Sequence, residues 1–570
     1  MKATKPNSVF RLQSTKEDHS IMGTVRVQRK DFIVPRCTEA CPAGVDVPRY
    51  IRAVRDGKYD EAVAVLREKL PLPTVCADAC FAPCEEVCAY KQFGDPIAIR
   101  AIKRAAVDRG KDAWKKKKKV AKKTGRKVAI VGAGPAGLTA AYYLVTKGHE
   151  VTLFDSFPKP GGMLRYGIPN YRLPEKRLDR DIQSILEWGV KFQGNTAIGK
   201  DIPLDQLKAD YDAIFLAGGA NASARIPLKG TEKKGVLWGW DFLKDVKLGK
   251  ASKLRGDVLV VGGGNVAIDV ALTAKRLGAK NVHLFCLEKR EEMPAHEWEI
   301  SLAEEEGVLI NNSWAPKKVL GEASVTGLQL MKCTSVFDRE GKFNPTYDEK
   351  TTKKTEGKTV ILAVGQTADL GYLSGQKGIK VQSGRIEANP KDLSTAEQGI
   401  FAGGDVVSGP ASIIQAIAQG RKAASAMDQY LGGDGNIEEI LAKPEKEVRL
   451  PEFSGDAIPR SPMPLLKLKD RSAGFGQVER GLTDDQIASE TRRCLNCDAR
   501  RFEVVLNTEY CKECGYCAEV CGVNTFAPAE FFNAKGYRPQ EVKSSKWCVG
   551  CFKCYFACPD FAIDVKQVSA

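Results

Sequence analysis

The sequence predicts an α/β protein in which two nucleotide-binding folds lie between cysteine-rich ends. Between about residues 127 and 430, short β-rich runs alternate with glycine-rich turns and helical patterns, which is typical of doubly wound parallel sheets. Two glycine fingerprints of the GxGxxG type lie in this region. Of the 18 cysteines, all except Cys286 and Cys333 lie outside it, in two terminal blocks.

Length and composition exclude several classes of protein. The 570 residues are enough for about three or four domains, and 43% of them are hydrophobic, as in globular proteins. No run of about 18 apolar residues predicts a membrane span. The N-terminus, MKATKPNSVF, lacks the apolar core of a signal peptide, so we expect a cytoplasmic protein.

Cysteine spacing distinguishes the two terminal blocks from the isolated cysteines. In a cytoplasmic chain, dense cysteines at short spacings indicate metal ligands rather than disulfides. Cys286, in VHLFCLE, is expected to be a buried strand residue, and Cys333, which has no cysteine nearby, is expected to be structural. The basic run DAWKKKKKVAKKTGRK is interpreted as a solvated linker, or alternatively as a patch for an acidic partner.

The first fingerprint lies in KVAIVGAGPAGLTAAYYLVTKGHEVTLFD. A β-rich run leads into three glycines, which permit a tight turn, close approach of the backbone to a pyrophosphate and close helix packing. The N-terminus of the following helix favours the phosphate charge, and the next strand ends at an aspartate that can hydrogen-bond ribose hydroxyls. The candidate binding residues are Gly132, Gly134, Pro135, Ala136, Gly137 and Asp155.

The second fingerprint has the form GxGxxA and follows the β-rich run VLVV. The next strand, VHLFCL, ends at a glutamate, so the same geometric reasoning applies. The candidate residues are Gly262, Gly264, Asn265, Val266, Ala267, Glu288, Lys289 and Arg290. An electron-transfer enzyme explains two dinucleotide sites together, one for FAD and one for NAD(P)H. Because hydride transfer needs no acid or base, we expect no catalytic side chain.

The C-terminal block has the spacing of bacterial two-cluster ferredoxins, in which the fourth cysteine of each CxxCxxCxxxC run binds the other cluster. We therefore expect one 4Fe–4S cluster on Cys511, Cys514, Cys517 and Cys558, and a second on Cys548, Cys551, Cys554 and Cys521. Zinc is the alternative, although four-cysteine zinc sites usually present two separated CxxC pairs. Gly522 replaces the usual proline after the first run, which removes no ligand.

Residues 127–430 resemble the flavoprotein core of the glutamate synthase small subunit family, whose plan recurs in dihydropyrimidine dehydrogenase and in bifurcating ferredoxin:NADP oxidoreductases. The motifs GGMLRYGIPNYRLP, LAGGA, ILAVGQ and IFAGGDVVSGPASIIQAIAQGRKAA carry the resemblance. It implies that the first motif lies along the flavin, that LAGGA and ILAVGQ are crossings between the two nucleotide domains, and that Asp405 contacts the ribityl chain. The flavin-site residues implied here are Gly161, Gly162, Arg165, Gly167, Ala217, Gly218, Gly365, Gly404, Asp405, Ala411, Ser412 and Ala416.

One departure from the family concerns the nicotinamide cofactor. Relatives that prefer NADPH commonly place arginines at the end of the second strand of this domain, where this chain has Leu287 and Glu288. A carboxylate hydrogen-bonds a free ribose diol and repels a 2′-phosphate. We therefore expect NADH to be preferred over NADPH, with Lys289 and Arg290 as the residues that would otherwise rescue phosphate binding.

The N-terminal block resembles the helical iron–sulfur domain of the same family. The resemblance assigns Cys37 and Cys88 to one cluster and Cys41, Cys80 and Cys84 to another. The CxxC that the family places before the first of these is absent, and the family's Glu or Gln ligand falls at Lys103, whose ammonium offers no acceptor.

Three further cysteines provide a repair. ETRRCLNCDAR resembles the missing segment, so we expect Cys494 and Cys497 to join Cys37 and Cys88. Cys76 would complete the other cluster. The alternative is that the late CxxC is a relic and that only one N-terminal cluster exists.

The resemblance implies an electron-transfer subunit linking NAD(H), through FAD, to low-potential 4Fe–4S clusters and then to ferredoxin or a partner enzyme, such as a 2-oxoacid, aldehyde or aromatic acyl-CoA redox complex. Alternatives are a glutamate synthase small subunit, which lacks a ferredoxin-like tail, a flavin-bifurcating subunit, and a non-catalytic relay scaffold. The net charge of +16 fits docking to an acidic ferredoxin, basic tails that confer solubility, or nucleic-acid binding. No zinc-finger or helix-turn-helix pattern supports the last.

These inferences together give the expected domain order. The segments are a helical iron–sulfur domain at 1–110, a basic linker at 111–126, an FAD-binding domain in two parts at 127–224 and 363–432, an NAD(P)-binding domain at 225–362, a connector with the CxxC at 433–498, and an α+β ferredoxin-like domain at 499–570.

Overall fold

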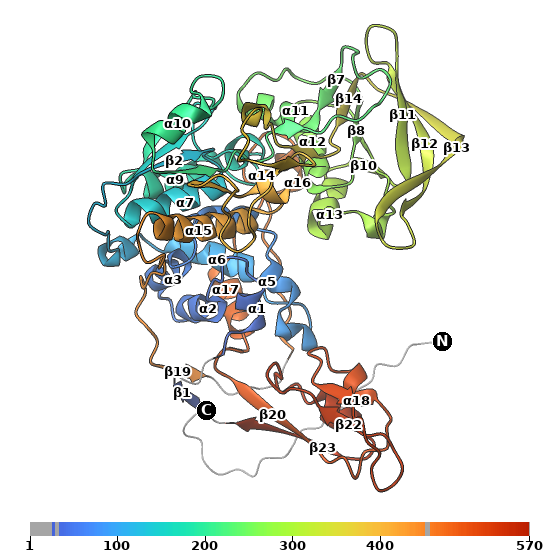
Figure 1. The fold of residues 1–570 in the computed structure, drawn as a ribbon. Coiled ribbons are helices and arrows are strands. Elements are labelled where there is room, and N and C mark those ends of the chain that lie inside the picture. Colours follow the sequence, from blue (N-terminus) through green and yellow to red (C-terminus); the bar gives the residue numbers. More distant parts are fainter. Residues whose placement is uncertain (1–24, 29–32, 451–456, 569–570) are drawn as a thin grey trace. The chain divides into compact units, whose positions relative to one another are not determined.

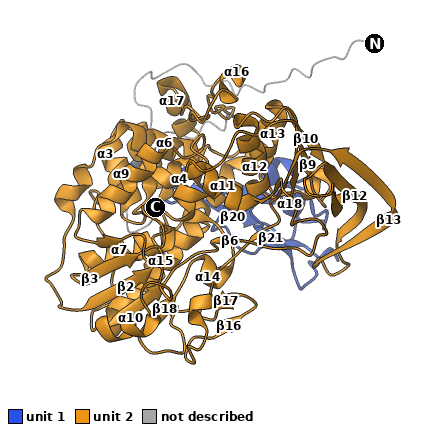
Figure 2. Cartoon of the chain, turned by 90° about the horizontal axis from the view of Figure 1, so that it is seen from above, with its two compact units in different colours: residues 1–33, 445–457, 495–570 blue, residues 34–444, 458–494 orange. Residues whose placement is uncertain are grey.

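The computed structural model describes residues 25–28, 33–450 and 457–568. It divides into two compact units, coloured separately in Figure 2: residues 34–444 with 458–494, and residues 1–33 with 445–457 and 495–570. The N-terminal segment that lacks a signal-peptide pattern lies outside the described residues. Within the described ranges, none of the helices has the length and apolar character needed to cross a membrane.

The first nucleotide fold, which contains the strand labelled β2 in Figure 1, is a five-stranded parallel sheet in the order β18-β5-β2-β3-β4. Its strands are β2 (Lys127–Val131), β3 (Glu150–Phe154), β4 (Lys191–Gln193), β5 (Ala213–Leu216) and β18 (Ile400–Ala402). The associated helices are α7 (Pro135–Thr146), α8 (Met163–Tyr166), α9 (Glu175–Leu186), α10 (Leu204–Asp210), α14 (Asp405–Ser408) and α15 (Ile413–Tyr430). The interior strand β5 is buried throughout because helices cover a parallel sheet on both faces.

The second nucleotide fold is another five-stranded parallel sheet, in the order β10-β9-β8-β14-β7. Its strands are β7 (Val236–Trp238), β8 (Val258–Val261), β9 (Val282–Phe285), β10 (Val308–Asn311) and β14 (Thr359–Leu362). Its helices are α11 (Gly239–Lys247), α12 (Asn265–Arg276) and α13 (Glu297–Glu305). The predicted α/β class, with two Rossmann-like parallel sheets, is confirmed.

The two sheets are interleaved along the chain. The chain leaves the first sheet after β5, builds the whole second sheet, and returns to the first at β18. The two crossings lie side by side, because β6 (Ala222–Ser223) and β15 (Gln366–Thr367) form an antiparallel pair. Strand β6 begins shortly after the LAGGA motif, and strand β15 begins at the last residue of ILAVGQ.

The N-terminal cysteines lie in a helical region of the larger unit. Its helices are α1 (Arg36–Glu39), α2 (Val47–Arg55), α3 (Tyr59–Arg67), α4 (Pro73–Ala79), α5 (Pro83–Glu86) and α6 (Ile99–Arg109). The late helix α17 (Asp484–Arg492) packs against α2 and α6, which brings the segment before Cys494 back to this region.

The sequence suggested that the basic run is a solvated linker, but the structure buries part of it. Trp114 is 1% exposed and lies beneath the Arg67 guanidinium, which is 4.2 Å from its ring centre. Lys118 pairs with Glu439, and its ammonium lies 4.2 Å from the centre of the Tyr142 ring. The remaining lysines of the run are mostly exposed, so only part of it is free to meet solvent or a partner.

Several smaller elements complete the larger unit. An antiparallel sheet of β11 (Trp314–Leu320), β12 (Gly327–Phe337) and β13 (Phe343–Glu356) interrupts the second nucleotide fold, and no sequence signal predicts it. The predicted structural residue Cys333 is buried in β12. Other small elements include the short strand pair of β16 (Val381–Gln382) and β17 (Arg385–Ile386) and the helix α16 (Leu468–Arg471).

The smaller unit contains the C-terminal cysteines. Two antiparallel strand pairs form it: β20 (Arg501–Leu506) with β23 (Ile563–Val568), and β21 (Phe526–Pro528) with β22 (Gln540–Val542). Two short helices, α18 (Tyr516–Glu519) and α19 (Lys553–Ala557), each follow a cysteine turn. A further pair, β1 (Val25–Gln28) with β19 (Glu447–Leu450), belongs to the same unit.

Candidate functional site

The first glycine turn, between β2 and α7, depends on contacts that only glycine allows. Gly132 has a φ of +106°, and a Cβ there would lie 2.3 Å from the carbonyl oxygen of Ala217 at the end of β5. A Cβ at Gly137 would lie 2.0 Å from the Gly132 carbonyl oxygen. A Cβ at Gly134 would meet no atom within 4 Å, so open space lies beside the N-terminus of α7.

A cavity beside this turn is lined by both of the expected flavin motifs. The sequence-predicted residues that line it are Gly132, Gly134, Pro135, Ala136, Asp155, Gly162, Ala217, Gly218, Gly404, Asp405 and Ala416. The predicted residues outside its lining are Gly137, Gly161, Arg165, Gly167, Gly365, Ala411 and Ser412. Two segments more than two hundred residues apart in the chain therefore form one pocket.

Two of the residues outside the lining have supporting contacts instead. The buried Arg165 guanidinium pairs with Asp179 and donates a 2.6 Å hydrogen bond to the Pro160 carbonyl oxygen, which fixes the loop before the flavin motif. Ser412 caps α15: the Gln415 backbone N–H donates to its hydroxyl at 3.3 Å, and the Gln415 side-chain oxygen accepts from the Ser412 N–H at 3.1 Å.

The two predicted aspartates of this cavity differ in how they are held. The Asp155 carboxylate accepts hydrogen bonds from the backbone N–H of Ala133 at 2.7 Å and of Phe157 at 2.9 Å, so it braces the glycine turn while keeping lone pairs for a further donor. Burial raises the pKa of Asp405 to about 6, and the backbone N–H of Ala411 opposes this rise.

Several lining residues were not found from the sequence. Phe157, Met163, Trp240 and Tyr372 all line the cavity. Met163 lies within GGMLRYG, where the motif offered a signal, whereas Trp240 and Tyr372 come from segments without a motif. The Tyr372 hydroxyl is buried and has no hydrogen-bond partner within the described part of the chain. Apolar walls, an open glycine cradle and an unsatisfied hydroxyl fit a flavin nucleotide.

The second glycine turn, between β8 and α12, repeats the geometry of the first. Gly262 has a φ of +141°, and a Cβ there would lie 2.3 Å from the Ala363 carbonyl oxygen at the end of β14. A Cβ at Gly263 would lie 2.5 Å from Oε2 of Glu288, so this carboxylate lies against the turn. Burial raises the pKa of Glu288. Cys286 is buried, one residue beyond the end of β9 rather than within it.

The other predicted nicotinamide-site residues have protein partners. Asn265 begins α12, and its side-chain oxygen accepts a 3.0 Å hydrogen bond from the His296 N–H. The Arg290 guanidinium makes two 2.7 Å hydrogen bonds to the carboxylate of Glu297. The Lys289 ammonium is exposed and lies 3.8 Å from the carboxylate of Glu292. Val266 and Ala267 follow the turn in α12, where Ala267 is fully buried.

Four cysteines of the helical region lie within electrostatic reach of one buried lysine. Burial raises the pKa of the Cys76 thiol, Cys80 and Cys41 raise it further, and the Lys103 ammonium opposes them. Burial likewise raises the pKa of Cys84, and Lys103 again opposes the rise. The predicted set of Cys41, Cys76, Cys80 and Cys84 is thus brought within electrostatic reach of a single cation.

The remaining N-terminal cysteines lie near the returning segment. Cys88 is 8% exposed; burial raises its pKa, and the guanidinium of Arg493 is among the groups that lower it. The same guanidinium lies 4.4 Å from the centre of the Tyr90 ring and donates a 3.2 Å hydrogen bond to the Pro96 carbonyl oxygen. Cys494, the next residue, is therefore held close to the segment that follows Cys88. Cys497 belongs to the smaller unit.

The C-terminal cysteines influence one another's pKa in two groups. Burial raises the pKa of Cys517 to about 11, and the thiols that add to this rise are Cys511, Cys514 and Cys558. Burial raises the pKa of Cys554 to about 12, and the thiols that add to this rise are Cys548, Cys551 and Cys521. In the described ranges, no three His, Cys, Asp or Glu side chains are placed to hold a single metal ion. A 4Fe–4S cluster does not require such convergence, because each cysteine binds a different iron.

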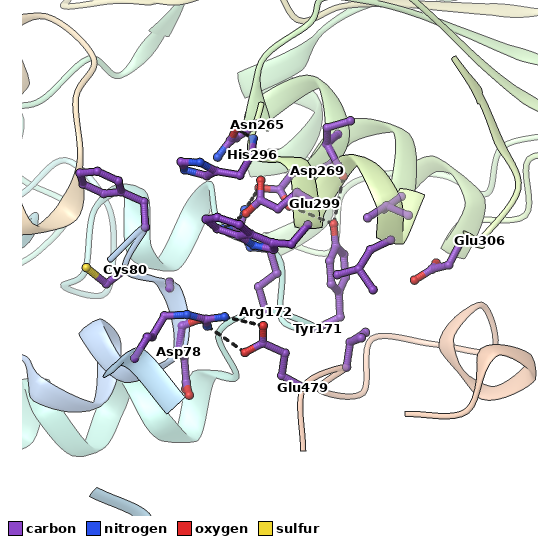
Figure 3. A pocket seen from close by; sticks show the side chains of 18 residues that line it. Asp78, Cys80, Tyr171, Arg172, Asn265, Asp269, His296, Glu299, Glu306 and Glu479 are labelled. Atoms are coloured by element: carbon purple, nitrogen blue, oxygen red, sulfur yellow. Dashed lines mark hydrogen bonds and ion pairs between the residues drawn. The ribbon is translucent and has the colours of Figure 1, made fainter. Parts of the chain in front are cut away.

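A second cavity lies where the helical region meets the two nucleotide folds (Figure 3). The Arg172 guanidinium pairs with the carboxylates of Asp269 and Glu299, each at 2.6 Å. Arg100 binds Glu479 through two hydrogen bonds of 2.7 and 2.8 Å. Cys80 also lines this cavity, so one predicted cluster ligand lies next to the nicotinamide fold. These ion pairs join segments distant in sequence, and no local pattern predicts them.

Comparison with known proteins finds two family models and related chains of similar plan. Residues 126–420 match the model of pyridine nucleotide-disulphide oxidoreductases, and residues 30–115 match dihydropyrimidine dehydrogenase domain II, described as a 4Fe–4S cluster domain. The NADP(+)-dependent formate dehydrogenase subunit beta of Moorella thermoacetica is 37% identical over 507 residues, covering 82% of this chain and 71% of that protein.

Two further relatives differ in the cofactor that they are named for. The NADPH glutamate synthase small chain of Mycobacterium tuberculosis is 33% identical over 433 residues, covering 71% of this chain and 88% of its own length. The NAD-dependent dihydropyrimidine dehydrogenase subunit PreT of Salmonella typhimurium is 34% identical over 403 residues, covering 69% of this chain and 91% of its own length.

Proposed function

The chain belongs to the pyridine nucleotide-disulphide oxidoreductase family and carries a 4Fe–4S domain of the dihydropyrimidine dehydrogenase type, and from this premise we propose that it transfers electrons between NAD(H) and low-potential 4Fe–4S clusters through FAD. The observation that carries the proposal is the cavity that the two flavin motifs share. The same chain also contains a second glycine turn and grouped cysteines. FAD accepts two electrons as a hydride and returns them singly, which suits one-electron clusters.

The residues of the first fold bind and orient the flavin nucleotide in this proposal. Gly132 and Gly134 let the backbone approach the pyrophosphate, and α7 offers its N-terminal N–H groups. Asp155 holds the turn and accepts from a ribose hydroxyl, and Asp405 accepts from the ribityl chain. Trp240 and Tyr372 cover the cavity and exclude water.

The residues of the second fold select NADH. Glu288 lies against the glycine turn, where its carboxylate would accept hydrogen bonds from a ribose diol and repel a 2′-phosphate. Arg290, the nearest arginine in the sequence, is already bound by Glu297. The relatives' names include both cofactors, so the preference rests on these contacts. Steady-state reduction with each cofactor tests it, and a strong preference for NADPH would refute it.

The cysteines bind up to four clusters in this proposal. The C-terminal sets are Cys511, Cys514, Cys517 and Cys558, and Cys548, Cys551, Cys554 and Cys521. The N-terminal sets are Cys41, Cys76, Cys80 and Cys84, and Cys37, Cys88, Cys494 and Cys497. The packing of α17 and the contacts of Arg493 support the return of Cys494. Unchanged iron in a Cys494→Ala, Cys497→Ala variant would exclude the last set.

A partner protein completes the reaction in this proposal. Relatives are named as subunits of formate dehydrogenase and dihydropyrimidine dehydrogenase. We infer a larger redox complex or an acidic ferredoxin as the partner, with 2-oxoacid, aldehyde and aromatic acyl-CoA systems as the enzyme classes. Anaerobic affinity purification from the native host identifies the partner. Recovery of a large glutamine-cleaving chain would instead support a glutamate synthase small chain, as one relative's name suggests.

An anaerobic titration tests the electron path itself. NADH should bleach the flavin absorbance and generate the electron paramagnetic resonance (EPR) signals of reduced clusters. The Gly262→Ala variant should block reduction by NADH but not by dithionite, because its Cβ would overlap the Ala363 carbonyl oxygen. A wild-type flavin that NADH leaves oxidised, while dithionite reduces it, would refute the proposed function.

A further inference from the structure

Lys103 is a buried cation without a carboxylate partner. It lies on α6 and is 5% exposed, and its side chain makes no ion pair or hydrogen bond within the residues that the structure describes. The next residue, Arg104, is equally buried but lies 3.7 Å from the carboxylate of Asp78 and 3.3 Å from that of Asp108. The carboxylates near α6 therefore pair with Arg104 and not with Lys103.

Several thiols lie within electrostatic reach of Lys103. Burial lowers its pKa, but Cys80, Cys76, Cys84 and Cys41 together raise it above the ordinary lysine value. Cys76 is fully buried on α4, which packs against α6, and Cys80 and Cys84 are each 5% exposed. The four cysteines within electrostatic reach of the ammonium are those assigned to one N-terminal cluster.

A buried ammonium requires a nearby negative charge. Moving an unpaired ammonium out of water costs several kcal/mol, and neutral thiols do not repay it. Thiolates that bind iron remain negative, and a 4Fe–4S cluster with four thiolates carries a net negative charge that grows by one when it gains an electron. Net charge and hydrogen bonds to sulfur are the protein's main means of setting the reduction potential of such clusters.

We propose that Lys103 is the counter-charge of an all-cysteine 4Fe–4S cluster on Cys41, Cys76, Cys80 and Cys84, and that it raises the reduction potential of this cluster. The inference rests on the proposed function, since it needs that cluster to be present. The residue occupies the position at which the resembled family supplies a Glu or Gln ligand, so a cation replaces a ligand and Cys76 takes over the coordination. Reduction adds one electron and requires no proton from Lys103, because the ammonium is already protonated.

The electrostatic reasoning predicts a selective shift. Lys103→Met keeps the apolar stem and removes the charge, and Lys103→Arg keeps the charge. In the methionine variant we expect the ratio of reduced to oxidised cluster at a fixed potential to fall about tenfold or more, which is a shift of about 59 mV for a one-electron couple. The arginine variant should stay near the wild-type potential, as should Lys58→Met, a control at an exposed lysine.

The experiment is an EPR-monitored redox titration of the full-length protein, with iron and flavin measured on the same samples. A lower potential for one 4Fe–4S signal in Lys103→Met alone supports the proposal, and so does loss of about four irons in Lys103→Met but not in Lys103→Arg. Unchanged potentials with full iron, or equal loss of iron in both variants, overturn it. The Cys76→Ala variant distinguishes a wrong cluster assignment from a wrong role of Lys103. Full iron in that variant would show that the cluster assignment itself is wrong.

Discussion

Glu288 offers the sharpest test of how the nicotinamide fold selects its cofactor. Its carboxylate lies 2.5 Å from where a Cβ on Gly263 would lie, so it borders the turn that faces the nucleotide. Hydrogen bonds to a charged group contribute about 1.5–3 kcal/mol. Since 1.36 kcal/mol is a factor of ten in rate, Glu288→Ala should lower kcat/KM for NADH by about 10- to 160-fold.

The same substitution should act differently on NADPH. Removing the carboxylate removes the repulsion of a 2′-phosphate, so kcat/KM for NADPH should stay level or rise. Glu288→Gln should fall between Glu288→Ala and wild type with NADH, because the amide keeps an acceptor without the charge. Glu292→Gln is the control, since Glu292 accepts a 3.1 Å hydrogen bond from the Lys289 N–H on the same loop.

The assay is steady-state reduction of an artificial one-electron acceptor under anaerobic conditions, with each cofactor in turn. Flavin content per chain is measured in parallel, so that a folding defect is recognised. An equal loss with NADH and NADPH would refute the reasoning, because it would mean that Glu288 supports the turn rather than the ribose. A Glu292→Gln effect as large as that of Glu288→Ala would have the same meaning.

Three further predictions concern stability and cofactor retention. Burial raises the pKa of Asp405 from 3.8 to about 6, so the flavin-free protein should lose stability as pH rises from about 4 to about 6, by about 3 kcal/mol in full. The stability difference between Asp405→Asn and wild type, measured by denaturant unfolding at pH 5 and 7.5, should therefore grow with pH. A constant difference would contradict this. Arg493→Met leaves the buried Glu490 carboxylate without its cation, so it should destabilise the protein by about 3–5 kcal/mol and lower iron content, and normal iron with normal stability would count against this role. Gly132→Ala places a Cβ 2.3 Å from the Ala217 carbonyl oxygen at a residue whose φ is +106°, so the purified variant should contain little flavin. Gly474→Ala, where a Cβ would have open space, should retain flavin. A Gly132→Ala variant with a full complement of flavin would refute the reasoning.

Local patterns predicted the parts of this protein that are built from contiguous residues. The glycine turns at Gly132 and Gly262, each between a strand and a helix, followed from short-range spacing. The crossed cysteine sets stay a prediction from the spacing of the two C-terminal runs, and Cys558 is among the thiols that raise the pKa of Cys517. In each case a few neighbouring residues determine the backbone path, so the sequence carries the information locally.

The sequence did not predict features that depend on distant contacts. Lys118 lies in a run of lysines that looks solvated, yet its side chain is buried against Tyr142 and Glu439. Tyr372 and Trp240 reach the flavin cavity from segments without a motif. The partner of Arg100 is Glu479, almost four hundred residues away. Ion pairs and cavity walls of this kind are set by tertiary packing, which no local periodicity records.

The interleaving of the two sheets also constrains the order in which the chain can fold. β5 ends at Leu216, but its neighbour β18 begins only at Ile400, so the first sheet remains incomplete while the whole second sheet is being synthesised. At about 5–20 residues per second this delay lasts about 10–40 s. The inserted sheet can form by itself in that interval, and the pairing of β6 with β15 then holds its two ends together. The flavin cavity, which needs Asp405, is therefore among the last sites of the larger unit to be completed on the ribosome.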